Sequence, residues 1–236
     1  MDSPRWLTDP LLVHQYGPGV AQVARGRVSA SGAGWAWIDS GGRPAHLTGA
    51  RGPMLPVTLR VERVPPLRPG SLVTLDLSRA RPWNANPRPE PAGASDVRDG
   101  CDAVRAHAWN DPRAHRLGIA PLDESLRDLV GRGPGLTPAG DDALLGYLIA
   151  RDNRAISARI VWAVRGASTA PSLALVRWAA QGQPPEVAAD MLAALLCADG
   201  HAIGPALVRL VALGGTTGRA ILTGMLAGLR ELPPAG

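Results

Sequence analysis

The sequence predicts an α+β protein: a small antiparallel β barrel or sandwich at the N-terminus, followed by a mainly α-helical domain. The hydrophobic period changes along the chain. Short alternating runs extend to about residue 80, and helix-like spacing begins after about residue 95. Between them, residues 81–95 are rich in proline and aperiodic, which is typical of a linker. We therefore expect a β-rich domain over 1–80, a linker over 81–95 and a helical domain over 96–236.

The β-rich half is predicted from short strands separated by turn residues. The run GWAWID alternates and places Trp35 and Trp37 on one face of a strand. The turn residues DSGG (Asp39–Gly42) follow, and RPAHLT is the returning strand. LPVTLRVERV and GSLVTLDLS are two further strand-like runs. About five short strands of this kind favour a barrel or sandwich.

The second half has the apolar spacing of helices throughout. SDVRDGCDAVRAHAW predicts a helix over 95–109. Further helices are predicted at 122–131, 138–152, 155–165, 170–181, 186–198, 202–213 and 217–231. Ser168 and Thr169 precede Pro171 at the start of one of them and are most simply a helix cap.

Composition narrows the possible functions. The chain has 236 residues and a net charge of +5, and its 25 basic residues are all Arg. Without Lys, Schiff-base and P-loop lysine chemistry are excluded. The Arg residues are scattered, whereas a nucleic-acid footprint is clustered, so we expect no nucleic-acid partner. No signal-peptide pattern and no apolar run of ~18 residues is present, so we expect a cytoplasmic protein without a membrane partner.

One stretch, GRGPGLTPAGDDALLGYLIA, carries the strongest site signal. Thr137 is predicted as the N-cap of a helix and Pro138 as its first residue. Asp141 and Asp142 then fall in the first turn, where their charge complements the helix dipole by ~0.3–1 kcal/mol each. A capped helix preceded by a loop is one interpretation of this stretch.

A ligand or metal site is the other interpretation, and the sequence leaves both open. Gly131, Gly133 and Gly135 alternate before the cap, and a glycine inside the helix, Gly140, costs up to ~1 kcal/mol relative to Ala. Glycines allow close approach to the backbone, and amides at a helix N-terminus attract anions. The two aspartates would repel a bare phosphate unless Mg²⁺ lies between, or unless the ligand carries its own donors. The candidate ligand-binding residues here are Gly133, Gly135, Thr137, Gly140, Asp141 and Asp142, with Asp141 and Asp142 as candidate metal ligands.

A second element, LGGTTGRAILTGMLAGL, has a similar pattern. Glycines precede Thr216 and Thr217, which join the candidate ligand set, and a helical pattern follows. Gly218 and Gly224 are six residues apart, as are Gly140 and Gly146, so the two elements are a possible internal repeat. Alternatively, glycines such as Gly224 only permit close helix packing.

The run GRGPGLTPAGDD resembles the AllH-type family, described as a subunit of bacterial oxamate carbamoyltransferase in allantoin and purine degradation. The family pattern G-x-G-P-G-L-T-P-x-G-D-D matches Gly131–Asp142 throughout, and the resemblance extends over most of the chain. It includes the β-rich start, the Trp-Pro region near Trp83, the Thr…Ser run at Thr169 and Ser172, and the glycine-rich final helix. In the last motif, the family usually has His where this chain has Gly215, and Asp where it has Ala220.

Three functions remain open. The resemblance implies a subunit of a carbamoyltransferase-like complex, with other subunits as partners and a small anion, carbamoyl phosphate or oxamate, as ligand. A non-catalytic assembly or small-molecule-sensing module of the same fold is the alternative, which the altered final motif favours. Nucleic-acid binding is the third. Catalytic residues are not identified: the five histidines lack metal-ligand spacing, GxSxG is absent, and we expect little transfer activity from the chain alone.

Overall fold

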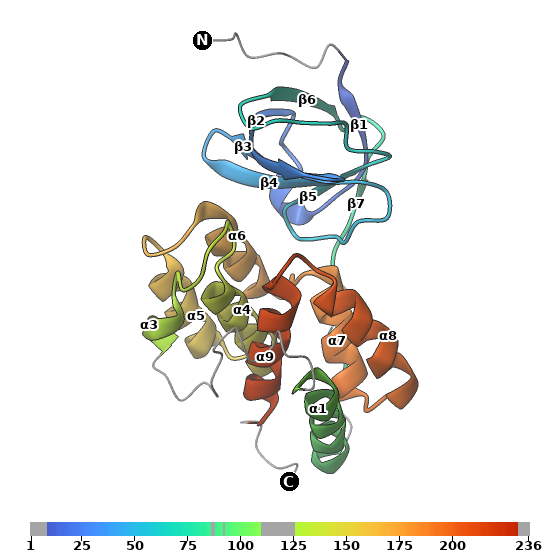
Figure 1. Ribbon diagram of the computed structural model, residues 1–236, viewed down its shortest axis with the longest axis vertical. Helices are drawn as coiled ribbons and strands as arrows, with labels where there is room; N and C mark the ends of the chain where they lie inside the picture. The colour runs from blue at the N-terminus through green and yellow to red at the C-terminus, as the bar shows by residue number, and fades with distance from the viewer. Residues whose placement is uncertain (1–8, 86–87, 92, 110–125, 231–236) are drawn as a thin grey trace. The chain divides into compact units, whose positions relative to one another are not determined.

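The computed structural model describes residues 9–85, 88–91, 93–109 and 126–230 (Figure 1). The chain divides into two compact units, Met1–Ala85 and Asn86–Gly236. The first contains the β-strands and the second the α-helices, so the predicted α+β class is confirmed. None of the described helices is both long enough and apolar enough to cross a membrane.

The first unit is a six-stranded barrel with one further strand. Its sheet has the order β5-β4-β3-β2-β6-β1-β7, and pairing of β5 with β1 closes the barrel. The strands are β1 (Leu11–Tyr16), β2 (Arg25–Gly32), β3 (Trp35–Ser40), β4 (Arg43–Thr48), β5 (Thr58–Val61), β6 (Leu72–Asp76) and β7 (Arg81–Pro82). A short 3-10 helix, η1 (Pro18–Val20), follows β1.

The barrel contains both antiparallel and parallel pairings. The β3–β4 hairpin has the predicted glycine turn, with positive φ at Gly41 and Gly42, as a two-residue hairpin turn requires. However, β4 pairs parallel with β5, and β1 pairs parallel with β6 and β7, so the barrel is not purely antiparallel. Strand β7 also lies inside the stretch predicted as linker. Strand β1 was not predicted, because its run LLVHQY lacks a clear alternation.

The core of the barrel is formed by buried aliphatic side chains and one polar pair. Trp37 is buried, whereas Trp35 is 37% exposed. The Trp37 ring packs against the buried His46 ring, with 5.2 Å between ring centroids. His46 Nδ1 lies 3.1 Å from Thr58 Oγ1, which satisfies a polar group inside the barrel. The aliphatic core includes Val13, Val28, Ile38, Leu47, Leu59 and Val73.

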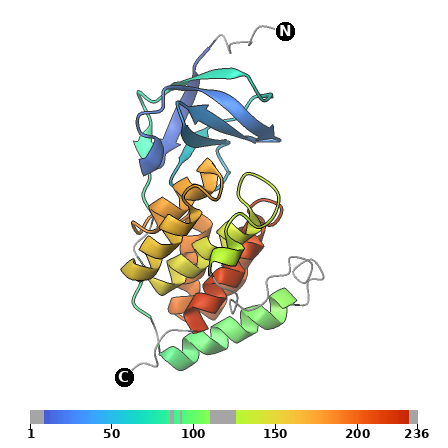
Figure 2. The same ribbon diagram turned by 90° about the vertical axis from the view of Figure 1, so that its left-hand side faces the viewer.

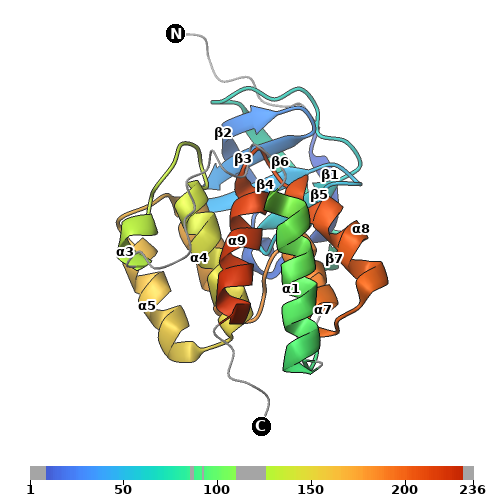
Figure 3. The same cartoon turned by 60° about the horizontal axis from the view of Figure 1, so that its bottom comes forward.

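The second unit is built around one buried helix, α4 (Ala139–Arg151). Residues 140–150 are all buried, as expected for a helix that is covered on every side. Helices α3, α5, α6, α7 and α9 contact it, and Figure 3 shows α4 between α5 and α9. The other helices are α1 (Ala94–Trp109), α3 (Leu126–Leu129), α5 (Arg154–Val164), α6 (Ala170–Ala179), α7 (Glu186–Leu196), α8 (Gly200–Val211) and α9 (Thr217–Arg230).

The predicted helices match those of the structure, apart from their ends. Of the helix predicted over 122–131, only α3 lies within the described residues. Helix α8 contains Pro205 and begins at Gly200, two residues before its predicted start, because Asp199 caps it. Thr169 caps α6, as the sequence predicts, by accepting a hydrogen bond from Ser172 N at 3.2 Å.

Helices α4 and α9 form the closest helix pair of the unit and lie side by side in Figures 1 and 2. Contacts advance along both helices in the same direction: Gly224 packs on Ala143, and Gly228 packs on Ala150. The two helices are therefore parallel, with their N-termini at the same end. This arrangement brings the two glycine-containing segments selected from the sequence together.

Candidate functional site

The loop before α4 has a conformation that glycine favours. Gly131, Gly133 and Gly135 have φ angles of 70°, 109° and 103°, in a region that residues with a Cβ rarely adopt. Gly131 is also confined, because an added Cβ would lie 2.9 Å from Ala167 O. Around Gly135 no atom would lie within 4 Å of such a Cβ. The alternating glycines therefore allow the backbone conformation of this loop. Gly133 and Gly135 are exposed to solvent.

Gly140 has a packing role in the first turn of α4. A Cβ at this position would lie 1.9 Å from Leu129 O, which allows no side chain without movement of the backbone. Its amide donates a hydrogen bond to Arg132 O at 2.9 Å. The cost of glycine in a helix is thus offset by close contact with the end of α3. The structure places Gly140 in contact with this chain's own backbone, inside the protein.

Asp141 is buried and organises the loop. Its Oδ1 accepts a hydrogen bond from Gly131 N at 2.8 Å, and its Oδ2 accepts one from the Ser168 hydroxyl. The carboxylate thereby connects the glycine loop to the segment before α6. Both of its oxygens are engaged within the protein, so Asp141 has a structural role beyond complementing the helix dipole.

Asp142 is buried as well, with 2% of its surface exposed, but it is not fully satisfied. Its Oδ2 has no hydrogen-bond partner in the described part of the chain. Burial raises the pKa of Asp142 to about 7. Hydrogen bonds from Thr217 and, less strongly, from Thr137 lower this pKa, whereas the neighbouring charge of Asp141 raises it further. A buried carboxyl oxygen without a partner is costly, so it marks a position where a ligand could supply the missing contact.

Thr137 does not cap α4. The N-cap residue is Pro138, whose side chain makes no capping hydrogen bond, and the prediction of Thr137 as N-cap was wrong. The Thr137 hydroxyl instead lies 3.2 Å from the Thr217 hydroxyl at the start of α9. The parallel packing of α4 and α9 explains this difference, because it offers Thr137 a partner in place of the helix amides.

Three candidate residues from the sequence therefore meet at one point, namely Thr137, Asp142 and Thr217. Thr216 is exposed beside this point. The two helix N-termini add positive electrostatic potential there, because the amide dipoles of both helices point the same way. Polar groups from two segments about 80 residues apart thus form one site at the junction of α4 and α9.

Thr169 and Ser172 lie near the glycine loop but were not among the candidate ligand-binding residues. The Thr169 hydroxyl donates to Leu136 O at 2.5 Å and so holds the glycine loop against α6. Ser172 is 2% exposed, and its Oγ has no hydrogen-bond partner in the described part of the chain. A cap motif in the sequence signals only a helix start, so the contact with Leu136 could not be inferred from it.

Magnesium was one of two possibilities raised by the sequence, with Asp141 and Asp142 as candidate metal ligands. Within the described residues, no three His, Cys, Asp or Glu side chains lie together in an arrangement that could hold a metal ion. Since both Asp141 oxygens accept hydrogen bonds from the protein, Asp142 alone offers an oxygen without a partner. Mg²⁺ commonly binds through one or two carboxylates together with the oxygens of an anionic ligand. A magnesium ion at this site would therefore depend on the ligand for most of its coordination.

The positions at which the last motif departs from the usual family pattern lie on either side of this junction. Gly215 is exposed, and no atom would lie within 4 Å of a Cβ added there. Ala220 is fully buried in the first turn of α9. This chain thus has no imidazole at the first position and no carboxylate at the second.

A family comparison covers most of the helical unit. The family model described as oxamate carbamoyltransferase subunit AllH matches residues 129–229, which include the glycine loop and helices α4 to α9. The resemblance to the AllH family is thereby confirmed over this segment. No curated protein and no solved structure gives a significant match to the chain.

Proposed function

We propose that this chain is a subunit of an oxamate-carbamoyltransferase-type complex and that it binds a small ligand with a carbamoyl or amide group where α4 and α9 begin. The description of the matching family names a subunit of such an enzyme, which supports a multi-subunit assembly. The observation that carries the binding proposal is the buried Asp142 Oδ2. This oxygen has no hydrogen-bond partner in the described part of the chain, and the paired Thr137 and Thr217 hydroxyls lie near the Asp142 side chain.

The chemistry of the site suits a ligand with both donors and acceptors. The N–H groups of a carbamoyl or amide group would donate to Asp142 Oδ2, and the ligand oxygens would lie in the positive potential of the two helix N-termini. A bare phosphate would meet the Asp142 carboxylate and be repelled. Because the pKa of Asp142 is about 7, the carboxyl also exchanges its proton near neutral pH, as a proton-transfer group requires.

Binding to the full chain tests the ligand. Oxamate and carbamoyl phosphate are titrated by calorimetry into the wild type and the Asp142→Asn variant, with and without Mg²⁺. Asparagine keeps the shape but presents an amide in place of a carboxylate, so affinity should fall about tenfold or more, or ~1.4 kcal/mol. The exposed Asp128→Asn is the matched control in the same unit and should bind as the wild type does. Equal affinity of all three proteins would refute the proposed site.

Partners are tested separately. Purification of the tagged chain from its native host, followed by mass spectrometry, should recover other subunits of a carbamoyltransferase. The isolated chain should show little carbamoyl transfer, because the matching family is described as one subunit of the enzyme and the chain has no Lys to act as a nucleophile. Robust turnover of oxamate and carbamoyl phosphate by the single chain would contradict the role of a dependent subunit.

A non-catalytic sensing or assembly module is the second candidate function. It is favoured by Gly215 and Ala220, because the usual family pattern has a polar His and a polar Asp at these two positions. The two functions differ in a reconstitution experiment. If the chain is a catalytic subunit, adding it to the purified partner subunits restores carbamoyl transfer, and the Asp142→Asn variant does not. A sensing module binds its ligand but leaves the rate of the partners independent of Asp142.

A further inference from the structure

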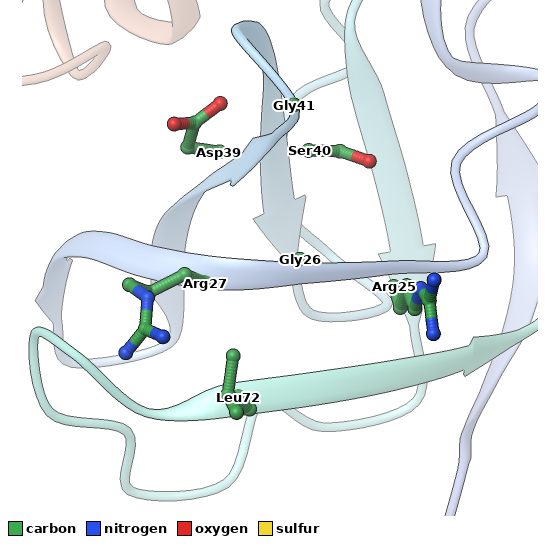
Figure 4. Close-up of a pocket in the computed structure, with 7 residues that line it drawn as sticks. All are labelled: Arg25, Gly26, Arg27, Asp39, Ser40, Gly41 and Leu72. Atoms are coloured by element: carbon green, nitrogen blue, oxygen red, sulfur yellow. The ribbon is translucent and has the colours of Figure 1, made fainter. Parts of the chain in front are cut away.

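The barrel contains a pocket that belongs to neither the glycine loop nor α9. It has a volume of about 500 Å³, within the range of small-molecule sites. Figure 4 shows Arg25, Gly26 and Arg27 of β2 between Leu72 of β6 on one side and the end of β3 on the other. The lining residues are Arg25, Gly26, Arg27, Asp39, Ser40, Gly41 and Leu72.

Strand register explains why these side chains share one face. Arg27 is directly paired with Leu72 on β6 and with Asp39 on β3. Directly paired residues point to the same side of a sheet, and so does Arg25, two positions before Arg27. The barrel therefore presents a row of an apolar, a cationic and an anionic side chain, with a second cation beside it.

The opposite charges of this row are not paired with each other. Arg27 Nη1 donates to Gly70 O at 3.0 Å, and Asp39 Oδ1 accepts from Gly42 N at 2.7 Å. Within the described residues, no ion pair joins Arg27 to Asp39, and the Arg25 side chain makes no hydrogen bond or ion pair. Backbone contacts thus orient Arg27 and Asp39 while part of each group stays available. A guanidinium binds carboxylates well, and a carboxylate accepts from N–H groups.

We propose that this pocket binds a small carboxylate that also carries an amide or amine N–H. The ligand carboxylate lies between the guanidinium groups of Arg25 and Arg27, and its N–H group donates to Asp39. Leu72 forms an apolar wall beside the ligand. The proposal stands on the barrel alone, and oxamate is the probe because it has both a carboxylate and an amide N–H.

Nuclear magnetic resonance of the full chain locates the binding. Oxamate is added to about 20 mM, well above a millimolar dissociation constant, and the amide signals are followed. The signals of Gly26, Gly41 and Leu72 should shift in a saturable way. Pyruvate has a methyl group in place of the oxamate NH₂, so it should bind at least threefold more weakly. Absence of saturable shifts at these amides would overturn the proposal.

Three variants test the chemistry. Arg25→Gln removes a guanidinium that makes no hydrogen bond or ion pair among the described residues, so it should weaken oxamate binding about tenfold without unfolding the barrel. Asp39→Asn keeps an oxygen for Gly42 N but accepts less strongly, so it should abolish the preference for oxamate over pyruvate. The control is Arg63→Gln, an exposed Arg outside the pocket. An equal loss in the control would show general charge attraction and refute a specific site.

The same spectra distinguish this pocket from the site at α4 and α9. Shifts confined to the amides around Thr137 and Thr217 would overturn the barrel proposal and leave the proposed function standing. Shifts confined to the barrel amides would support the barrel proposal and overturn the proposed ligand site at α4 and α9. Shifts at both places that respond separately to Arg25→Gln and Asp142→Asn would support two independent sites.

Discussion

Gly146 and Gly224 pack reciprocally where α4 crosses α9. A Cβ added to Gly146 would lie 1.9 Å from Ile221 O, and one added to Gly224 would lie 1.8 Å from Ala143 O. Each glycine therefore lies against the residue three positions before the other. Of the two possibilities raised by the sequence, the structure shows the close helix packing at these glycines, and the internal repeat stays a prediction.

Alanine at either glycine should destabilise the helical unit. No carbonyl contact below 2 Å can be kept, so α4 and α9 must separate, and we expect Gly146→Ala and Gly224→Ala each to lower the free energy of unfolding by about 1–3 kcal/mol or more. Gly200→Ala is the matched control, because a Cβ there meets nothing within 4 Å and no proline follows it. It should leave stability unchanged or raise it by up to about 1 kcal/mol. Urea denaturation measures all three, and equal midpoints for the variants would contradict the packing.

Asp142 should make the helical unit less stable as pH rises. Its pKa is about 7 in the folded state and 3.8 when exposed, so the folded state binds the proton more tightly. The corresponding stability is fully present below pH 3.8 and lost as pH rises to about 7, by at most about 4 kcal/mol. Asp142→Asn should remove this pH dependence and be the more stable protein at pH 8. A wild-type unit with constant stability between pH 4 and 8 would contradict the burial of an uncompensated carboxyl.

His46 should act in the opposite direction in the barrel. Burial lowers the pKa of His46 to about 4 from 6.5, so the unfolded state binds the proton more tightly. Stability should fall as pH drops from 6.5 to about 4, by about 3 kcal/mol at most. Hydrogen exchange of the β4 amides in the full chain, corrected for intrinsic rates, measures this unit separately from α4. His46→Gln should lose the dependence and the exposed His14→Gln should keep it; identical behaviour of both variants would exclude His46 as the cause.

Arg88 should stabilise the C-terminal end of α4. Its guanidinium donates to Ile149 O at 2.7 Å and to Ala150 O at 2.9 Å, which satisfies carbonyls that have no partner within the helix. Arg88→Ala should cost about 1.5–3 kcal/mol, since charged hydrogen bonds are lost from a half-buried position. Arg88→Lys should recover only part of this, because an ammonium lacks the forked geometry. Equal stability of wild type and Arg88→Ala in urea would contradict this role.

The fold could be predicted from the sequence where a local pattern decides the structure. The hairpin at Gly41 and Gly42 and the cap at Thr169 were found because turn and cap preferences act over a few residues. The parallel pairing of β4 with β5 was not, because it depends on closure of the barrel by distant strands. Such pairing leaves no signal in either strand alone.

The candidate site was predicted only in part, because its hydrogen bonds, like the pairing of β4 with β5, join segments that are distant in the sequence. Asp141 and Asp142 are adjacent and equally buried, yet Asp141 has its hydrogen bonds and Asp142 Oδ2 has none. Their partners come from separate segments, Ser168 for one and Thr217 for the other. No rule of spacing distinguishes the two residues, and Thr137 appeared to be a cap until α9 was placed beside it. The pocket at Arg25 likewise depends on the register of three strands.

The contact between Thr137 and Thr217 also bears on how the helical unit is made. The two residues are 80 positions apart, and helices α4 to α8 lie between them in the sequence. During synthesis, α4 emerges long before α9, so its glycine face and Asp142 remain exposed to water until the last helix is complete. Contacts of such long sequence separation form slowly, because the intervening chain must first be ordered. We therefore expect the junction of α4 and α9 to assemble last, which makes the nascent chain most open to chaperones at this surface.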